Sequence, residues 1–171
     1  MFRYVAFLRG VSPMNLKMVD FKRCLETAGY SNVKTVLSSG NAAFDTSSKS
    51  AAVIEGQIEA TFTKRLGRSF YTIVRSVEEL QSLIERDPYS GFALPSNAKR
   101  VVTFARRLPA LKSRLPIERD GAQILAVKHR EAFSAYVPGP KRAVFMELIK
   151  ATFGSPVTTR TWETVKKCAK A

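Results

Sequence analysis

The chain has 171 residues, 45% of them hydrophobic, and its longest apolar runs are about five residues, so it can bury a core but lacks the roughly 20 apolar residues of a membrane span. Two cysteines, Cys24 and Cys168, and one histidine exclude a disulfide framework and a Cys/His zinc site, and predict a cytoplasmic, bacterial-type protein with reduced thiols. The formal net charge is +14. Residues 86–171 hold 17 basic and 6 acidic side chains, whereas residues 1–85 hold 11 basic and 8 acidic ones. The second half is therefore expected to attract polyanions, or else it is only a solvated basic surface.

The first half of the chain predicts the element order βαββαβ within residues 1–75. The expected elements are, in chain order, a strand at 3–8, a helix at 18–28, a strand at 33–37, the turn SSGN, a strand at 42–44, a helix ending near Gly67 and a strand at 70–75. This order is the split βαβ plait, also called ferredoxin-like. The first strand is apolar on both faces, so we expect helices to cover one face of its sheet, and the other plait or a second subunit to cover the opposite face.

Residues 76–171 predict a second and more basic plait. A connecting helix starts at the capping box of Ser76 and Glu79, and the linker-like stretch DPYSGFALPSN follows it. The expected elements after the linker are a strand at 100–105, a proline-bounded helical turn at 108–115, strands at 123–127 and 132–137, a helix at 144–153, an extended piece at 156–159 and a final helix. The sequence therefore predicts an α+β fold with two tandem ferredoxin-like subdomains, 1–75 and 76–171, the second ending in the C-terminal helix.

Polar residues gather at one predicted edge of the first sheet. In a plait, strands one and two run parallel with strand three between them, so the end of strand one and the turn after strand two share an edge. We expect the residues there to form one site for an anion or a polar ligand: Arg9, Gly10, Asn15, Lys17, Ser38, Ser39, Gly40 and Asn41. The alternative is purely structural, because serine, glycine and asparagine are what a tight turn needs in any case.

Several motifs together resemble a known bacterial family. RYVAFLRGV, a helix ending at AGY, VKTVLSSGNAAF and, far downstream, VTTRTWETVKK resemble the family called domain of unknown function 1697. The resemblance implies tandem plaits and brings no established activity. The family's loop after the first strand has the form INVGG; here it reads VSPMN, and Pro13 removes a backbone donor, which argues against a phosphate-cradling loop.

The family's C-terminal motif, TTRxW, is present at the predicted last helix. The expectation is that Arg160 enters this helix and that Trp162, on its first turn, anchors it to the core. If the helix returns toward the SSGN turn, Arg160 completes the anion site.

Known catalytic motifs are missing from the sequence. It has no P-loop, no GxGxxG and no GxSxG, His129 has no motif partner, and the carboxylates have no metal-ligand spacing, so we expect no metal and no cofactor. The predicted third strand, NAAFD, holds a single aromatic residue, unlike an RNA-binding plait.

Three hypotheses follow from these observations. The first is a binding module for an anionic ligand, either a nucleic acid or a phosphorylated metabolite, which uses the predicted edge site and the basic second half. The second is a small metal-independent enzyme that polarises an anionic substrate at the same edge. The third is a protein-interaction module without a ligand. The sequence predicts no membrane partner and no particular oligomeric state.

Overall fold

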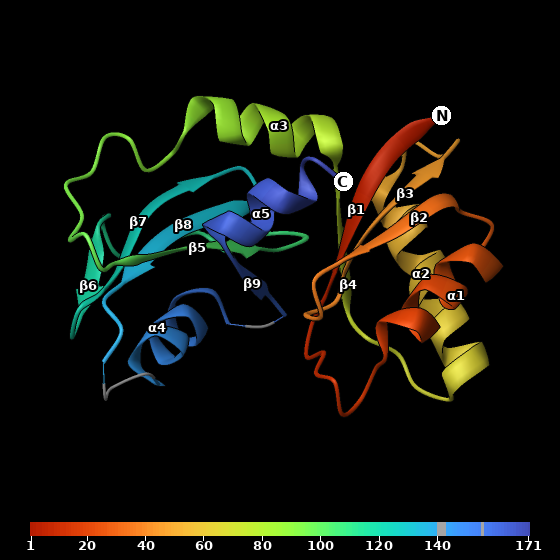
Figure 1. Cartoon of the computed structure of the whole chain (residues 1–171). Coiled ribbons are helices and arrows are strands. Elements are labelled where there is room, and N and C mark those ends of the chain that lie inside the picture. The colour runs from red at the N-terminus through yellow and green to blue at the C-terminus, as the bar shows by residue number, and fades with distance from the viewer. Residues whose placement is uncertain (140–142, 155) are drawn as a thin grey trace. The chain divides into compact units, whose positions relative to one another are not determined.

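The protein has an α+β fold with two antiparallel sheets and, in the part of the chain that the structure describes, five helices (Figure 1). The structure is a computed structural model, and it describes residues 1–139, 143–154 and 156–171. The strand order is β2-β3-β1-β4 in the first sheet and β6-β7-β8-β5-β9 in the second. The chain forms two compact units: the first consists of Met1–Glu85 with Thr164–Ala171, and the second of Arg86–Glu163.

The first unit contains the four-stranded sheet. Its elements are β1 (Phe2–Leu8), α1 (Met18–Thr27), β2 (Ser31–Val36), β3 (Asn41–Thr46), α2 (Ala51–Leu66) and β4 (Thr72–Ser76). Helix α3 (Val77–Arg86) follows β4 directly, and α5 (Trp162–Cys168) carries the chain back into this unit. The predicted capping box of α3 is present, because the Glu79 carboxylate accepts from Ser76 N–H at 2.7 Å and the Ser76 hydroxyl accepts from Glu79 N–H at 3.1 Å.

Helices α1 and α2 lie on one face of the first sheet (Figure 1). The alternate residues of β1 that face them, Tyr4, Ala6 and Leu8, share one apolar cluster with Phe21 of α1 and Phe62 of α2. The rings of Phe21 and Phe62 pack with their centroids 5.8 Å apart. On the opposite face of the sheet, Val5 and Phe7 are also fully buried, so the prediction that β1 is buried on both faces is confirmed.

The outer edge of β4 is bonded to two carboxylates of α2. The Glu55 and Glu59 carboxylates accept from the N–H groups of Val74 and Thr72, at 2.9 and 2.8 Å respectively. The two glutamates are four residues apart and therefore lie on the same face of the helix. Backbone donors that an edge strand would otherwise expose are thus satisfied within the unit.

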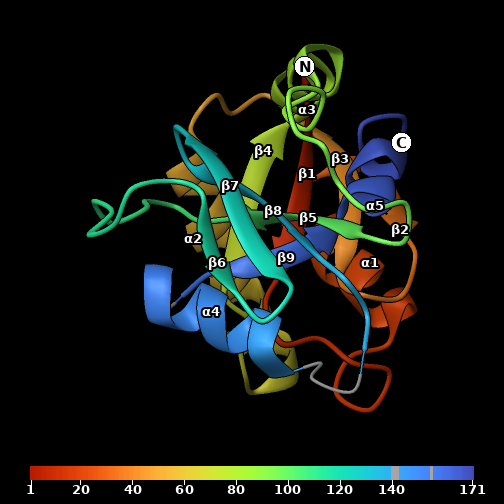
Figure 2. The same ribbon diagram turned by 90° about the vertical axis from the view of Figure 1, so that its left-hand side faces the viewer.

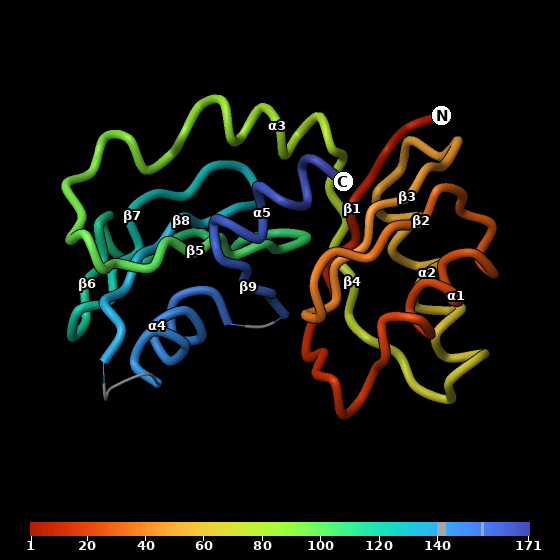
Figure 3. The backbone as a smooth tube through the Cα atoms, viewed as in Figure 1, coloured from red at the N-terminus to blue at the C-terminus, as the bar shows by residue number. Residues whose placement is uncertain are grey.

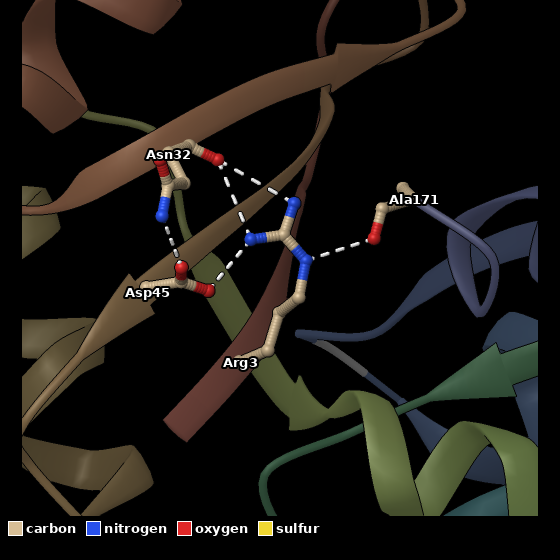
Figure 4. A network of polar contacts seen from close by, with 4 residues as sticks. All are labelled: Arg3, Asn32, Asp45 and Ala171. Atoms are coloured by element: carbon tan, nitrogen blue, oxygen red, sulfur yellow. Dashed lines mark hydrogen bonds and ion pairs between the residues drawn. The ribbon is translucent and has the colours of Figure 1, made fainter. Parts of the chain in front are cut away.

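A polar network joins the C-terminus to the first sheet (Figure 4). The Arg3 guanidinium donates to the Asp45 carboxylate at 2.6 Å and to the carbonyl oxygen of Ala171 at 2.8 Å. Asn32 Nδ2 donates to the other Asp45 oxygen at 2.6 Å. The hydrogen bond from Asn32, together with the hydrogen bond and charge of Arg3, lowers the pKa of Asp45 below its usual 3.8 although partial burial opposes the shift.

The second unit contains the five-stranded sheet and, among its described residues, helix α4. Its elements are β5 (Lys99–Phe104), β6 (Ile117–Arg119), β7 (Ala122–Lys128), β8 (Glu131–Tyr136), α4 (Ala143–Phe153) and β9 (Thr158–Thr161). Helix α4 contacts β6 and β7 (Figure 2) and buries Phe145, Leu148, Ile149 and Phe153 against the sheet. Trp162 is buried, as predicted, with its ring packed edge-on to Tyr89.

Two sequence-based predictions about the second unit are wrong. Residues 105–116 are irregular and form no helical turn at 108–115. Leu108, Leu111 and Leu115 have helical spacing and do pack against the core that α4 helps to form, but Pro109 and Pro116 disfavour helical geometry at the residues before them. Strand β6, which was not predicted, follows this segment. It pairs with β7 across the two-residue turn Asp120-Gly121, whose φ angles are 47° and 85°.

The second error concerns the segment before the last helix. Arg160 lies on β9, paired with Val102 of β5, and does not enter a helix, because α5 begins only at Trp162. The threonine-rich run TTRT forms an edge strand two residues further along the chain than the extended piece predicted at 156–159.

Candidate functional site

Three segments of the first unit meet at one end of the first sheet, and we call them the rim: residues 9–17 after β1, residues 37–41 around the turn between β2 and β3, and residues 68–71 before β4. Figure 3 shows the chain leaving β1 beside the turn between β2 and β3. Leu8 N–H donates to the Gly40 carbonyl oxygen at 2.9 Å, and Arg9 N–H donates to the Tyr71 carbonyl oxygen at 2.9 Å. The expected juxtaposition of the arginine-bearing loop and the SSGN turn is therefore present.

Gly40 allows the closest approach within the rim. Its φ is +85°, and a Cβ atom at this position would lie 3.0 Å from Val11 Cγ2 and 3.1 Å from Leu8 Cβ. Both the backbone conformation and the lack of space therefore require glycine here. The turn consists of Leu37 to Gly40, and Asn41 is already the first residue of β3.

The two asparagines of the predicted site hold the loops together. Asn41 is fully buried, and its Nδ2 donates to the Val36 carbonyl oxygen at 3.0 Å and to Ser39 Oγ at 2.9 Å. Asn15 accepts from Ser12 N–H at 2.8 Å and donates to the Gly10 carbonyl oxygen at 2.7 Å. Gly10, with φ +75°, turns the chain so that this closure is possible. These amides therefore shape the rim rather than project from it.

The exposed side chains of the rim are the ones that can meet a ligand. Arg9 and Lys17 are exposed on the loop, and Ser38 and Ser39 are exposed on the turn. Leu37 also lies on the surface, half exposed, with φ +59°, a conformation that is uncommon for a residue other than glycine.

Arg68 is a further rim cation that the sequence analysis missed. Its guanidinium donates to the Asn15 carbonyl oxygen and lies 5.5 Å from the centre of the Phe70 ring. The expected sheet could have indicated Arg68. A strand antiparallel to β1 begins at the end of the sheet where β1 stops, so the residues just before β4 lie at the rim.

Arg160, the last residue of the predicted site, belongs to the second unit. It is 8% exposed, and its guanidinium donates to Thr158 Oγ1 at 2.6 Å and to the Thr159 carbonyl oxygen at 2.8 Å. Its side chain is therefore held against its own strand.

The charge of the rim is of one sign. Its three segments contain Arg9, Lys17 and Arg68 and no acidic residue. Glu59 borders the rim, where its carboxylate accepts from Thr72 N–H. Exposed cations beside serine hydroxyls can bind phosphate or carboxylate oxygens through charge-assisted hydrogen bonds. In the described parts of the chain, no group of three or more His, Cys, Asp or Glu residues is arranged to hold a metal ion.

The comparisons with known proteins agree with the sequence motifs. A family described as "Protein of unknown function (DUF1697)" matches residues 1–133. The chain belongs to this family. The DUF1697 match includes the rim and ends before the TTRTW motif. No curated protein matches the chain.

A solved structure shows the same fold. It is that of the conserved bacterial protein SP0830 from Streptococcus pneumoniae, which is 18% identical, with a TM-score of 0.71 over 99% of this chain and 97% of that chain. Both comparisons leave the function open. No helix in the described residues is long and apolar enough to cross a membrane.

Proposed function

We propose that this DUF1697 protein is a binding module whose rim holds the phosphate groups of an anionic ligand, which is either a nucleic acid or a phosphorylated metabolite. The observation that carries the proposal is the convergence of Arg9, Lys17 and Arg68, from two separate segments, on one end of a sheet without an acidic neighbour in those segments. Electrostatic attraction to such a group of cations raises the encounter rate with polyanions.

The shape of the rim favours a nucleic acid over a small metabolite. Met14 is 94% exposed and Leu37 49% exposed, so two apolar side chains stand on the surface of the rim together with its cations. A polymer can contact cations and apolar side chains together across an open surface, whereas a metabolite binds best in a concave pocket. The basic second half, with its 17 basic and 6 acidic residues, adds non-specific attraction.

The test compares two variants with equal loss of charge. Arg9→Ala/Lys17→Ala/Arg68→Ala removes the rim cations, and Lys22→Ala/Lys34→Ala/Lys49→Ala removes three lysines outside the rim, so each lowers the formal net charge of +14 by three. Binding of a labelled single-stranded oligonucleotide is followed by fluorescence anisotropy over a salt series. Because each lost phosphate contact reduces the salt dependence by about 0.7 in log–log slope, the rim variant is expected to lose about 2 and the control much less.

A second experiment, with nucleotides, distinguishes a nucleic acid from a phosphorylated metabolite as the ligand. Thermal shifts with nucleoside mono-, di- and triphosphates detect a small phosphorylated ligand that binds the folded chain. A response to nucleotides that the rim variant abolishes, without oligonucleotide binding, would identify the metabolite. Equal weakening by both triple variants, or no binding of either probe by the unaltered protein, would overturn the proposal.

The fold interpretation that accompanies this proposal is a tandem duplication of the plait. In its support, the order β2-β3-β1-β4 of the first sheet recurs in the second as β7-β8-β5-β9, with β6 added outside β7. In this interpretation, residues 105–116 and β6 stand where α1 stands in the first unit. The location in a bacterial cytoplasm stays a prediction from the sequence.

A further inference from the structure

A cavity in the second unit, separate from the rim, combines an apolar wall with two cations. It has a volume of about 470 Å³, within the range of small-molecule sites. Its walls come from the irregular segment (Pro109, Ala110, Lys112 and Ser113), from Ile117 and Arg119 of β6, and from the C-terminal half of α4 with Gly154.

The apolar wall is built by α4 and β6. Leu148 and Phe153 come from the helix, and Ile117 comes from the strand. The same side chains belong to the core of this unit or pack against it, so the wall is fixed by packing. Leu148 and Phe153 are already buried, so an apolar ring or chain entering the cavity would gain mainly van der Waals contact with them and would cover the partly exposed Ile117.

Lys112 and Arg119 supply the charge. In the part of the chain that the structure describes, neither side chain forms a hydrogen bond or an ion pair, although both residues line the cavity. Side chains alternate along a strand, so Ile117 and Arg119 share one face of β6 while Glu118 points to the other. Of the two acidic neighbours of Arg119 in sequence, Glu118 is thus directed away from the cavity, and Asp120 belongs to the turn and does not line it.

The end of α4 opposes these cations only weakly. A helix C-terminus acts as roughly half a negative charge, whereas the two side chains carry two full positive charges. The end is also partly satisfied internally, because Gly154 N–H donates to the Lys150 carbonyl oxygen at 2.8 Å and the Thr152 hydroxyl donates to the Leu148 carbonyl oxygen at 2.7 Å. The cavity therefore keeps a net positive field.

We propose that this cavity binds a small amphiphilic anion, an apolar ring or chain with one anionic head. The apolar body lies against Leu148 and Phe153, and the head is bound by Lys112 and Arg119. Neither part of this assignment depends on the rim or on binding of nucleic acid.

Two probes of nearly equal shape test the proposal on the full chain. 1-Anilinonaphthalene-8-sulfonate carries a sulfonate, and N-phenyl-1-naphthylamine has the same rings without it. The anionic probe is expected to bind with one-to-one stoichiometry, measured by fluorescence and by calorimetry. Lys112→Ala/Arg119→Ala is expected to weaken it about tenfold, as for the loss of a charged hydrogen-bond partner, and to leave the neutral probe unchanged.

Two further variants make the outcome decisive. Lys128→Ala/Lys150→Ala removes two exposed lysines that do not line the cavity and is expected to bind both probes like the unaltered protein. Ala151→Trp fills the cavity from α4 and is expected to abolish binding of both probes while far-UV circular dichroism shows an intact fold. The proposal is overturned if the unaltered protein does not bind the anionic probe, if the control pair loses as much affinity as Lys112→Ala/Arg119→Ala, or if a folded Ala151→Trp binds normally.

Discussion

Four strands follow the same order in the two sheets. The units differ in the connection between the first and the second of these four strands along the chain, which are β1 and β2 in one unit and β5 and β7 in the other. In the first unit the crossing is α1, a helix of 10 residues that buries Phe21, Cys24 and Leu25. In the second unit the crossing from β5 to β7 is an irregular segment followed by β6, and leucines pack against the core from this segment without a helix. The helical crossing buries three side chains in its unit, whereas the irregular crossing is partly buried and lines a cavity of about 470 Å³ beside α4.

The largest effect is expected from truncating the helical crossing. Phe21→Ala removes a fully buried ring and should lower the free energy of unfolding by about 3–5 kcal/mol. Leu111→Ala, in the irregular crossing, removes a partly buried side chain and should cost only about 1–2 kcal/mol. Urea denaturation followed by circular dichroism measures both. Equal losses would contradict the distinction between a fully buried and a partly buried crossing.

A smaller effect distinguishes the two hairpin turns. Gly40 and Gly121 both have a φ of +85°, but a Cβ atom at Gly40 would meet Leu8 and Val11, whereas nothing lies within 4 Å of one at Gly121. Gly121→Ala should therefore cost about 1 kcal/mol for the backbone conformation alone, and Gly40→Ala about 2–3 kcal/mol because packing strain is added. Thermal unfolding of the two variants side by side measures the difference in stability. If Gly40→Ala costs no more than Gly121→Ala, Leu8 and Val11 can move to make room for the added methyl group.

The smallest effect concerns acid sensitivity in the first unit. The lowered pKa of Asp45 means that its bonds to Asn32 and Arg3 stabilise the folded state above pH 3.8 and that this contribution is lost as the pH falls through the folded-state pKa. Asp45→Asn should cost about 1 kcal/mol at pH 7, because the carboxylate is partly exposed, and progressively less below pH 3.8. Urea titrations at pH 7 and at pH 3 measure the difference, and a constant cost at both pH values would argue against this account.

The first unit was more predictable than the second, and the reasons are physical. Strand β1 and helices α1 and α2 follow apolar periodicity with clear stops. The element order expected from them was enough to predict that the turn ending at Gly40 lies beside the end of β1, where Leu8 N–H bonds the Gly40 carbonyl oxygen. The burial of Asn41 could not be read from the sequence, because an asparagine in a turn serves equally well as a ligand donor or as a partner for the turn's own carbonyl oxygens.

In the second unit, the apolar periodicity predicted a helical turn that is not there, and the turn signal that precedes β7 was overlooked. Leu108, Leu111 and Leu115 repeat at helical spacing, yet the two prolines beside them determine the backbone. The Asp120-Gly121 pair is a known hairpin signal that would have predicted β6. The place of Arg160 on β9 depends on pairing with β5, a contact between residues far apart in sequence that no local pattern reveals.

The carboxylates of Glu55 and Glu59 have a consequence for self-association. A second molecule that tried to extend the first sheet by adding a strand alongside β4 would find the N–H groups of Thr72 and Val74 already bonded. The added strand would have to break both bonds. The Glu55 and Glu59 carboxylates would then face the backbone carbonyl oxygens of the added strand, which is unfavourable because both groups only accept hydrogen bonds. Growth of fibres or swapped dimers from this side is therefore opposed by the helix that also builds the core.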